Sequence, residues 1–178
     1  MLDINFLPFP TLTTEHLILR QLEMTDDNEI LALRSDERVN EFIDRPKTIN
    51  IEEAREFINK INDGIAAGDW IYWAITQKIQ PKLIGTICYW NIAKENFVAE
   101  IGYELHPDYQ GKGIMQEAFA KVLKYGFQSM GLKMIEGYTN SANERSSKLL
   151  EKYNFKRKMV PGNINTKEVV YWLTKTSS

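Results

Sequence analysis

The chain has 178 residues, of which 43% are hydrophobic, and its formal net charge is −2 at pH 7. This length predicts a single domain, residues 1–178, that can bury a substantial core. Lysine and arginine are scattered without a basic stripe, so direct nucleic-acid binding is not expected. No stretch approaches about 20 consecutive apolar residues, so a membrane partner is not expected either.

The beginning of the chain and its cysteine content predict a cytoplasmic protein. The first residues include an acid and no basic cluster, unlike a secretory signal peptide. The lone cysteine, Cys88, lies in an apolar run and cannot form an internal disulfide, so a reducing compartment is expected. We interpret Cys88 as a small buried hydrophobic residue. Two histidines and one cysteine form no metal-binding constellation, so no metal is expected.

The first third of the chain predicts a strand and two helices. Residues 16–22 alternate as in a half-buried strand. Thr25 is expected to cap a helix that runs to about residue 34. Asn50 and Glu53 have the spacing of a capping box, and the apolar residues after them recur every three or four positions, which predicts a second helix.

The rest of the chain predicts strands, then alternating helices and strands. Residues 70–76 and 83–92 are rich in aromatic and β-branched side chains and predict a hairpin with a turn around Gln80-Pro81. The other expected elements are a strand at 97–105, a helix from Ile114, a strand at 133–139, a helix at 143–153, and strands near 155–160 and 169–174.

A glycine-rich turn, residues 110–115, joins the 97–105 strand to the long helix. The first N–H groups of a helix have no partner inside it and carry partial positive charge, and glycines let the backbone approach a ligand closely. This arrangement predicts a phosphate site. Gly113 stands where a Walker loop needs serine or threonine, and Gln116 stands where a Rossmann turn needs its third glycine, so neither pattern applies.

The same turn matches the Gln/Arg-x-x-Gly-x-Gly/Ala pattern that cradles the pyrophosphate of coenzyme A. Met115 departs from this pattern, because it replaces the small residue at the last position. A solvated turn before a surface helix is the alternative interpretation, since short glycine motifs often occur without a ligand.

Three segments together resemble the GNAT N-acetyltransferases, and more narrowly the branch of Rim-type ribosomal-protein N-terminal acetyltransferases. Residues 99–118, AEIGYELHPDYQGKGIMQEA, resemble the core motif of the family. Residues 14–20 resemble the opening strand of that branch, and residues 140–146 with 154–155 resemble its second motif. The similarity extends from about residue 12 to 174.

The resemblance implies an α+β fold of the GNAT type, a mostly antiparallel sheet of six to seven strands flanked by helices. It implies an acetyl-CoA-dependent N-acetyltransferase, with acetyl-CoA as co-substrate and no metal. The thioester carbonyl is expected near the backbone N–H of Leu105, and Asn143 is expected to cap its helix and to reach the pantetheine. The full set of expected coenzyme-binding residues is Leu105, Gln110, Gly111, Lys112, Gly113, Ile114, Met115 and Asn143.

Acetyl transfer needs a base that removes a proton from the amine. Glu100 is the first candidate, because it shares one face of its strand with Gly102 and Glu104 and burial would raise its pKa. It also lies near the position of the strand glutamate that acts as base in some GNAT enzymes. A structural hydrogen bond or ion pair is the alternative role for Glu100, and Glu104 or a water chain are the alternative bases.

The leaving thiolate needs a proton donor. Many GNAT enzymes have a tyrosine where this chain has Leu150, so that acid is absent here. Ser146 resembles the thiolate-facing hydroxyl of the Rim-type enzymes, and its alternative role is to satisfy backbone groups in the first helical turn. Asn154 replaces the usual glycine, which is tolerable because asparagine adopts left-handed backbone.

The resemblance implies the α-amine of a protein N-terminus, of ribosomal-protein type, as the acceptor. A small amine (polyamine, amino sugar or antibiotic) and a non-catalytic acyl-CoA-binding module are the alternatives. Acidic residues are frequent between Asp26 and Glu56, a region that borders the acceptor site in the family, which favours a cationic acceptor as a secondary interpretation. Trp90 is a candidate for lining the acceptor pocket. A monomer and a homodimer are both open.

Overall fold

The computed structural model describes residues 2–158 and 167–175. Its strands form one sheet in the order β1-β2-β3-β4-β5-β6-β8-β7, in which β5 and β6 are parallel and the other neighbours antiparallel. The strands are β1 (Leu12–Thr13), β2 (Leu17–Arg20), β3 (Ile71–Gln77), β4 (Gln80–Ala93), β5 (Val98–Leu105), β6 (Met134–Asn140), β7 (Lys156–Lys158) and β8 (Glu168–Thr174). The α-helices are α1 (Asp27–Ser35), α2 (Glu37–Asn40), α3 (Ile51–Ala67), α4 (Ile114–Tyr125) and α5 (Glu144–Lys152).

The predicted fold class is confirmed, and the described residues form eight strands instead of the predicted six to seven. The additional strand is β1, in which Leu12 and Thr13 pair with β2. Two residues are too few to show a hydrophobic alternation, so the sequence pattern did not reveal this strand. Residues 159 and 160 of the predicted 155–160 strand lie outside the described residues.

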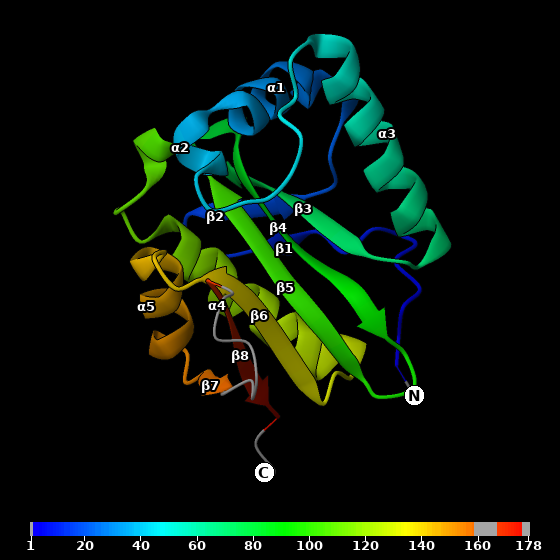
Figure 1. Ribbon diagram of the computed structural model, residues 1–178. Coiled ribbons are helices and arrows are strands. Elements are labelled where there is room, and N and C mark those ends of the chain that lie inside the picture. The colour runs from blue at the N-terminus through cyan, green and yellow to red at the C-terminus, as the bar shows by residue number, and fades with distance from the viewer. Residues whose placement is uncertain (1, 159–166, 176–178) are drawn as a thin grey trace.

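The helices cover the two faces of the sheet (Figure 1). On one face, Phe57 of α3 makes an edge-to-face contact with Tyr72 of β3, with 6.3 Å between ring centroids. On the other face, Trp73 contacts Tyr125 at the end of α4, and Tyr103 contacts Phe119 of α4, both with 5.3 Å between centroids. Since neighbouring side chains of a strand point to opposite faces, even-numbered residues of β5 face α1–α3 and odd-numbered residues face α4.

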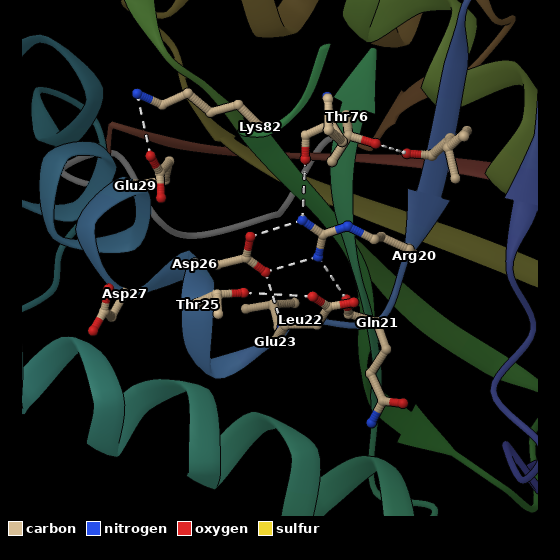
Figure 2. Close-up of polar contacts among 12 residues, drawn as sticks. Arg20, Gln21, Leu22, Glu23, Thr25, Asp26, Asp27, Glu29, Thr76 and Lys82 are labelled. Atoms are coloured by element: carbon tan, nitrogen blue, oxygen red, sulfur yellow. Dashed lines mark hydrogen bonds and ion pairs between the residues drawn. The ribbon is translucent and has the colours of Figure 1, made fainter. Parts of the chain in front are cut away.

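The connection from β2 to α1 is held by Asp26 and not by the predicted cap, Thr25. Thr25 lies inside a 3-10 turn, and α1 begins only at Asp27. The Asp26 carboxylate accepts a hydrogen bond from the Glu23 N–H at 2.8 Å and forms an ion pair with Arg20 of β2 at 2.7 Å, as Figure 2 shows. The Thr25 hydroxyl donates to the Glu23 carboxylate at 3.4 Å and caps no helix, and the Asp26 contacts close the 3-10 turn that precedes α1, so the helix begins later than predicted.

The hairpin of β3 and β4 turns at Lys78 and Ile79, two residues before the predicted turn around Gln80-Pro81. Gln77 pairs with Gln80, so the turn has only two residues. Pro81 falls where the register of the two strands shifts, a place where the ladder does not require its missing N–H.

Gly64 of α3 packs directly against the indole ring of Trp70. A Cβ at this position would lie 2.1 Å from Cε2 of Trp70, whose indole N–H donates to the carbonyl of Ile61 at 2.9 Å. We expect Gly64→Ala to lower the free energy of unfolding by about 1–3 kcal/mol through overpacking, in spite of the higher helix propensity of alanine. Urea denaturation measures this loss.

The neighbouring exposed substitution Asp63→Ala serves as the control, and its effect is expected to stay within about 0.5 kcal/mol. A Gly64→Ala chain as stable as the parent would contradict the steric argument.

Candidate active site

Strands β5 and β6 separate toward their carboxyl ends. Their pairing stops at Glu100 and Glu136, whereas β5 stays paired with β4 as far as Leu105. Figure 1 shows the two strands diverging beyond this point. The separation exposes one edge of β5 in the middle of the sheet.

The exposed edge of β5 carries two hydrogen-bond donors. The N–H of His106 donates to the carbonyl of Ile84 on β4 at 2.8 Å. Because backbone N–H groups alternate in direction along a strand, those of Tyr103 and Leu105 point away from β4 and into the gap, beyond the last pairing with β6 at Glu100 and Glu136. An extended ligand with carbonyl groups can therefore bind along β5 in place of a neighbouring strand. Leu105, predicted from the sequence, is the last of these donors.

The gap leads to the glycine-rich loop at the start of α4. Gly111 and Gly113 have φ of 73° and 78°, a left-handed backbone that glycine adopts readily. Gly113 is the N-cap of α4, and the first intrahelical bond runs from the Glu117 N–H to the Gly113 carbonyl at 3.1 Å. The N–H groups of residues 114–116 thus have no acceptor within the helix. These free N–H groups have the arrangement that an anion site would need, and anion binding there stays a prediction.

Gln110 joins this loop to its surroundings. Its side-chain amide donates to the Leu105 carbonyl at 2.9 Å, and its oxygen accepts a hydrogen bond from Arg145 of α5. Lys112 lies outside the cleft lining, with its ammonium group bonded to the Asp108 carbonyl at 2.8 Å. Of the expected coenzyme-binding residues, Lys112 alone does not contribute to the cleft wall.

One cleft of about 2020 Å³ contains the anion site, the open edge of β5 and the candidate catalytic residues. This volume exceeds the ~300–1,000 Å³ of a typical small-ligand pocket and leaves room for two substrates. The sequence-predicted residues that line it are Glu100, Glu104, Leu105, Gln110, Gly111, Gly113, Ile114, Met115, Asn143 and Ser146. Trp90, the candidate for the acceptor side, lines it as well.

Three cations on α5 line the same cleft and were missed in the sequence. Arg145, Lys148 and Lys152 lie on one face of the helix, on the side of the cleft near the start of α4. Lys152 also bonds the side chain of Gln116 in the first turn of α4. Their spacing of three and four residues is the signal that could have revealed this basic face.

Glu100 lies on the face of β5 that points toward α1–α3, as the alternation predicts. Its carboxylate accepts a hydrogen bond from the Asn91 amide at 2.9 Å. Burial raises the pKa of Glu100 above its ordinary value, and the hydrogen bond from Asn91 opposes this shift only in part. Glu100 has no ion pair among the described residues. A half-buried carboxylate with a raised pKa is a suitable proton acceptor.

Glu104, the second candidate base, is engaged in an ion pair. Its Oε2 lies 2.7 Å from Nη2 of Arg45, and the Glu104 side chain is only 8% exposed. The Thr86 hydroxyl donates to its other oxygen at 3.4 Å. The Glu104 carboxylate is thus already occupied by a guanidinium and a hydroxyl and is less available to an incoming amine. The surroundings therefore favour Glu100 over Glu104.

Ser146 lies in the first turn of α5, where Asn143 acts as the predicted N-cap. The Asn143 side chain accepts a hydrogen bond from the Ser146 N–H at 3.1 Å. The Ser146 hydroxyl is 2.8 Å from the hydroxyl of Tyr103 on β5, and burial raises the pKa of Tyr103 to about 12. Tyr103 was not predicted, because nothing in the sequence relates β5 to α5. Leu150 is fully buried, so its position offers no proton donor.

Two further expectations concern single residues. Asn154 has φ of 63°, the left-handed backbone predicted for it. Cys88 is buried, and burial raises the pKa of its thiol to about 12, in agreement with a hydrophobic role. Within residues 2–158 and 167–175, no group of three or more histidine, cysteine, aspartate and glutamate side chains is arranged to hold a metal ion. No helix in this part of the chain is long and apolar enough to cross a membrane.

The sequence profile of the Acetyltransferase (GNAT) domain matches residues 16–156. The chain belongs to the GNAT acetyltransferase family. It is 35% identical over 147 residues to the uncharacterised N-acetyltransferase p20 of Bacillus licheniformis, a match that covers 83% of each protein. It is also 26% identical over 101 residues to the [Ribosomal protein uS5]-alanine N-acetyltransferase of Escherichia coli, covering 56% of this chain and 52% of that enzyme.

Solved structures of the GNAT family agree with this assignment. A GNAT-family acetyltransferase from Bacillus anthracis has a TM-score of 0.77 and 26% identity, with 93% of this chain and 98% of the other covered. RimL, a ribosomal L7/L12 alpha-N-protein acetyltransferase in complex with coenzyme A, shares the fold with a TM-score of 0.82, 18% identity, and coverage of 93% and 98%. The predicted enzyme class is confirmed, an acetyl-CoA-dependent N-acetyltransferase.

Proposed function

We propose that this GNAT enzyme acetylates the α-amine of a protein N-terminus and that it acts in the cytoplasm. Binding of acetyl-CoA is supported by one observation, the open edge of β5 that leads to the glycine-capped start of α4. The choice of a protein N-terminus as acceptor is supported by a relative, since the uS5-alanine N-acetyltransferase of Escherichia coli is named for this type of acceptor.

The residues of the cleft fit acetyl-CoA in charge and in shape. The free N–H groups at the start of α4 and the basic face of Arg145, Lys148 and Lys152 suit the phosphates. The N–H groups of Tyr103 and Leu105 suit the amide and thioester carbonyls. Bound there, the coenzyme supplies an activated acyl group.

The chain's own residues would supply proton transfer and charge stabilisation. Glu100 removes a proton from the attacking amine, because its raised pKa and its place in the cleft suit a general base. The Leu105 N–H donates to the carbonyl oxygen, on which negative charge develops. Ser146 donates a hydrogen bond to the leaving sulfur and so stabilises its negative charge until solvent protonates it, and the neighbouring Tyr103 hydroxyl orients that donor.

Coenzyme binding and acetyl transfer test this proposal separately. We expect CoA to raise the thermal midpoint of the purified chain, because a ligand that binds only the folded state stabilises it. We expect release of CoA thiol from acetyl-CoA with N-terminal peptides as acceptors. Binding without turnover on any peptide or small amine would favour an acyl-CoA-binding module, and turnover on small amines alone would overturn the N-terminal acceptor.

Removal of the Tyr103 hydroxyl tests the orientation of Ser146. Tyr103→Phe keeps the contact with Phe119 and is expected to lower kcat by about tenfold. Ser146→Ala is expected to have a larger effect, and the double variant is expected to match Ser146→Ala alone, because the tyrosine acts through the serine. Steady-state kcat values on one peptide measure this. Additive losses in the double variant would contradict the pairing.

A further inference from the structure

The side of the cleft that faces α1 and α3 has a floor of small and aromatic side chains. Tyr72, Cys88 and Gly102 are neighbours in register on β3, β4 and β5, and all three line the cleft. A Cβ at Gly102 would lie 3.0 Å from the Cys88 sulfur, so this glycine leaves space above the floor. The even-numbered face of β5 also carries Glu100. With Glu100 as the proposed base, an acceptor amine would approach over this floor.

Arg34, in the last turn of α1, lies above the floor in a fixed position. Its guanidinium carbon is 3.9 Å from the centre of the Phe57 ring, and its Nε donates to the Thr48 hydroxyl at 3.1 Å. Burial, and secondarily the charge of Arg45, lower the pKa of Arg34. In the part of the chain that the structure describes, no carboxylate lies within ion-pair distance of Arg34. Its positive charge is thus partly desolvated without a direct counterion.

Arg45, between α2 and α3, is the second cation of this region. Its Nε donates to the Asn40 side chain at 2.8 Å, and the arginine side chain is only 16% exposed. Its Nη2 lies 2.7 Å from a Glu104 oxygen, but the N–H groups are not aligned to form a hydrogen bond. Glu104 is therefore the one close counterion for two guanidinium groups among the described residues. Two positive charges with one negative charge leave an excess that an anion would balance.

The acidic residues of the first third do not supply that balance. Of the ten acidic residues between Asp26 and Glu56, three do not line the cleft, namely Glu52, Glu53 and Glu56. Five pair with other cations, and these pairs are Asp26 with Arg20, Asp27 with Arg55, Glu29 with Lys82, Asp36 with Arg38 and Glu37 with Lys47. Glu41 and Asp44 do line the cleft, but both are exposed side chains. The acidic composition therefore does not produce an acidic wall next to the two arginines.

Arg34 and Arg45 lie beside a short part of β5, and this limits where an anion would bind. Arg34 lies near Tyr72, which is in register with Gly102 of β5 through Cys88, and near Glu104 of β5 itself. The two arginines therefore lie beside positions 102–104 of this strand. These positions are two to four residues from Glu100, or about 7–13 Å at about 3.3 Å per residue. That span corresponds to a group one or two residues from the reacting amine in an extended peptide.

From this geometry we propose that the acceptor carries an oxyanion, a carboxylate or phosphate, about 7–13 Å from its amine, recognised by Arg34 and Arg45. This inference rests on the proposed function and names the acceptor class of the same site. The planar guanidinium groups suit an oxyanion, because they present paired N–H donors. In a protein N-terminus the anion is an acidic side chain at the second or third residue. In a small amine it is the carboxylate or phosphate itself.

Matched acceptors that differ only in charge test the proposal. We expect kcat/KM for an Ala-Glu peptide to exceed that of the Ala-Gln peptide by about tenfold or more, and an Ala-Lys peptide to be the poorest acceptor. Arg34→Gln is expected to abolish the preference of the Ala-Glu peptide over the Ala-Gln peptide. Arg157→Gln removes the same charge from an exposed position on β7 and is expected to keep the preference. If Arg34→Gln does not fold, Arg34→Lys replaces it in the test. This variant keeps the charge, and its preference for the Ala-Glu peptide is expected to be intermediate.

The outcomes separate this inference from the proposed function. Equal rates on the Glu and Gln peptides would overturn the inference and leave N-terminal acetylation standing. Acetylation of 6-aminohexanoate, whose extended chain places its carboxylate within this span, but not of 6-aminohexanamide or of peptides would support the inference and overturn the peptide acceptor. If no amine is acetylated, the thermal midpoint is measured with glutarate and with glutaramide. An increase with glutarate alone, which is lost in Arg34→Gln, would support the oxyanion site. The absence of that increase would overturn it.

Discussion

Replacing Glu100 with glutamine is expected to lower kcat by about 10²–10⁴-fold, the usual contribution of a general base. Glutamine has nearly the same shape and keeps a hydrogen bond with Asn91, but it cannot accept a proton from the amine. The affinity for CoA is expected to stay unchanged, because Glu100 lies far along β5 from the loop that suits the phosphates. Release of CoA thiol at saturating peptide measures kcat, and calorimetric titration measures the CoA affinity.

The pH dependence gives this prediction a second readout. Burial raises the pKa of Glu100 above its ordinary 4.5, and only the deprotonated carboxylate can act as base. In the parent enzyme, kcat/KM is therefore expected to rise with pH through this raised pKa. In Glu100→Gln that limb of the profile is expected to be absent. An unchanged rate at every pH would remove Glu100 as the base and favour a water chain.

Glu100→Gln is expected to lower the activity without lowering the free energy of unfolding. The folded chain holds the Glu100 proton more tightly than the unfolded chain, so this group makes the protein less stable as pH rises from 4.5 through the raised pKa. At neutral pH, Glu100→Gln is therefore expected to be as stable as the parent or more stable.

Glu104→Gln is the matched comparison, on the same face of the same strand. It leaves Arg45 without its carboxylate and is expected to lower the free energy of unfolding by about 3–5 kcal/mol. Urea denaturation at neutral pH distinguishes the two variants, and a loss of stability in Glu100→Gln equal to that in Glu104→Gln would contradict the assignment.

Several features of the site followed from short stretches of sequence, because local rules determine them. Asn50 caps α3 by accepting a hydrogen bond from the Glu53 N–H at 2.9 Å, as its spacing predicts. The left-handed backbone at Gly111, Gly113 and Asn154 was predictable for the same reason, since only a few residue types tolerate it. In each case the conformation depends on the residue itself or on a partner a few positions away in the sequence.

The features that were not predicted depend on contacts between distant segments. Tyr103 meets Ser146 only because β5 and α5 border the same gap, and Arg45 meets Glu104 only because the loop before α3 folds over β5. No periodicity links such positions, so a single sequence carries no signal for them. The start of α1 shows the same effect, because Arg20 of β2 reaches the Asp26 carboxylate across the turn.

Replacing Gly113 with alanine is expected to weaken CoA binding by about 10–100-fold, or about 1.4–2.8 kcal/mol. Gly113 has φ of 78° and is the N-cap of α4, so the substitution strains the loop that directs the free N–H groups. A Cβ at this position would meet no protein atom within 4 Å. The added methyl group therefore projects into the space that the phosphates are expected to approach. Calorimetric titration with CoA measures the dissociation constant.

Gly131 provides a matched control at the other end of the same helical segment. Its φ is 80°, so alanine there meets a similar backbone strain of about 1–2 kcal/mol, but Gly131 does not line the cleft. Both variants are expected to lose similar stability in urea, and only Gly113→Ala is expected to lose affinity for CoA. Equal affinities in the two variants would show that the start of α4 does not bind the phosphates. The comparison therefore isolates the anion site from the general effect of backbone strain.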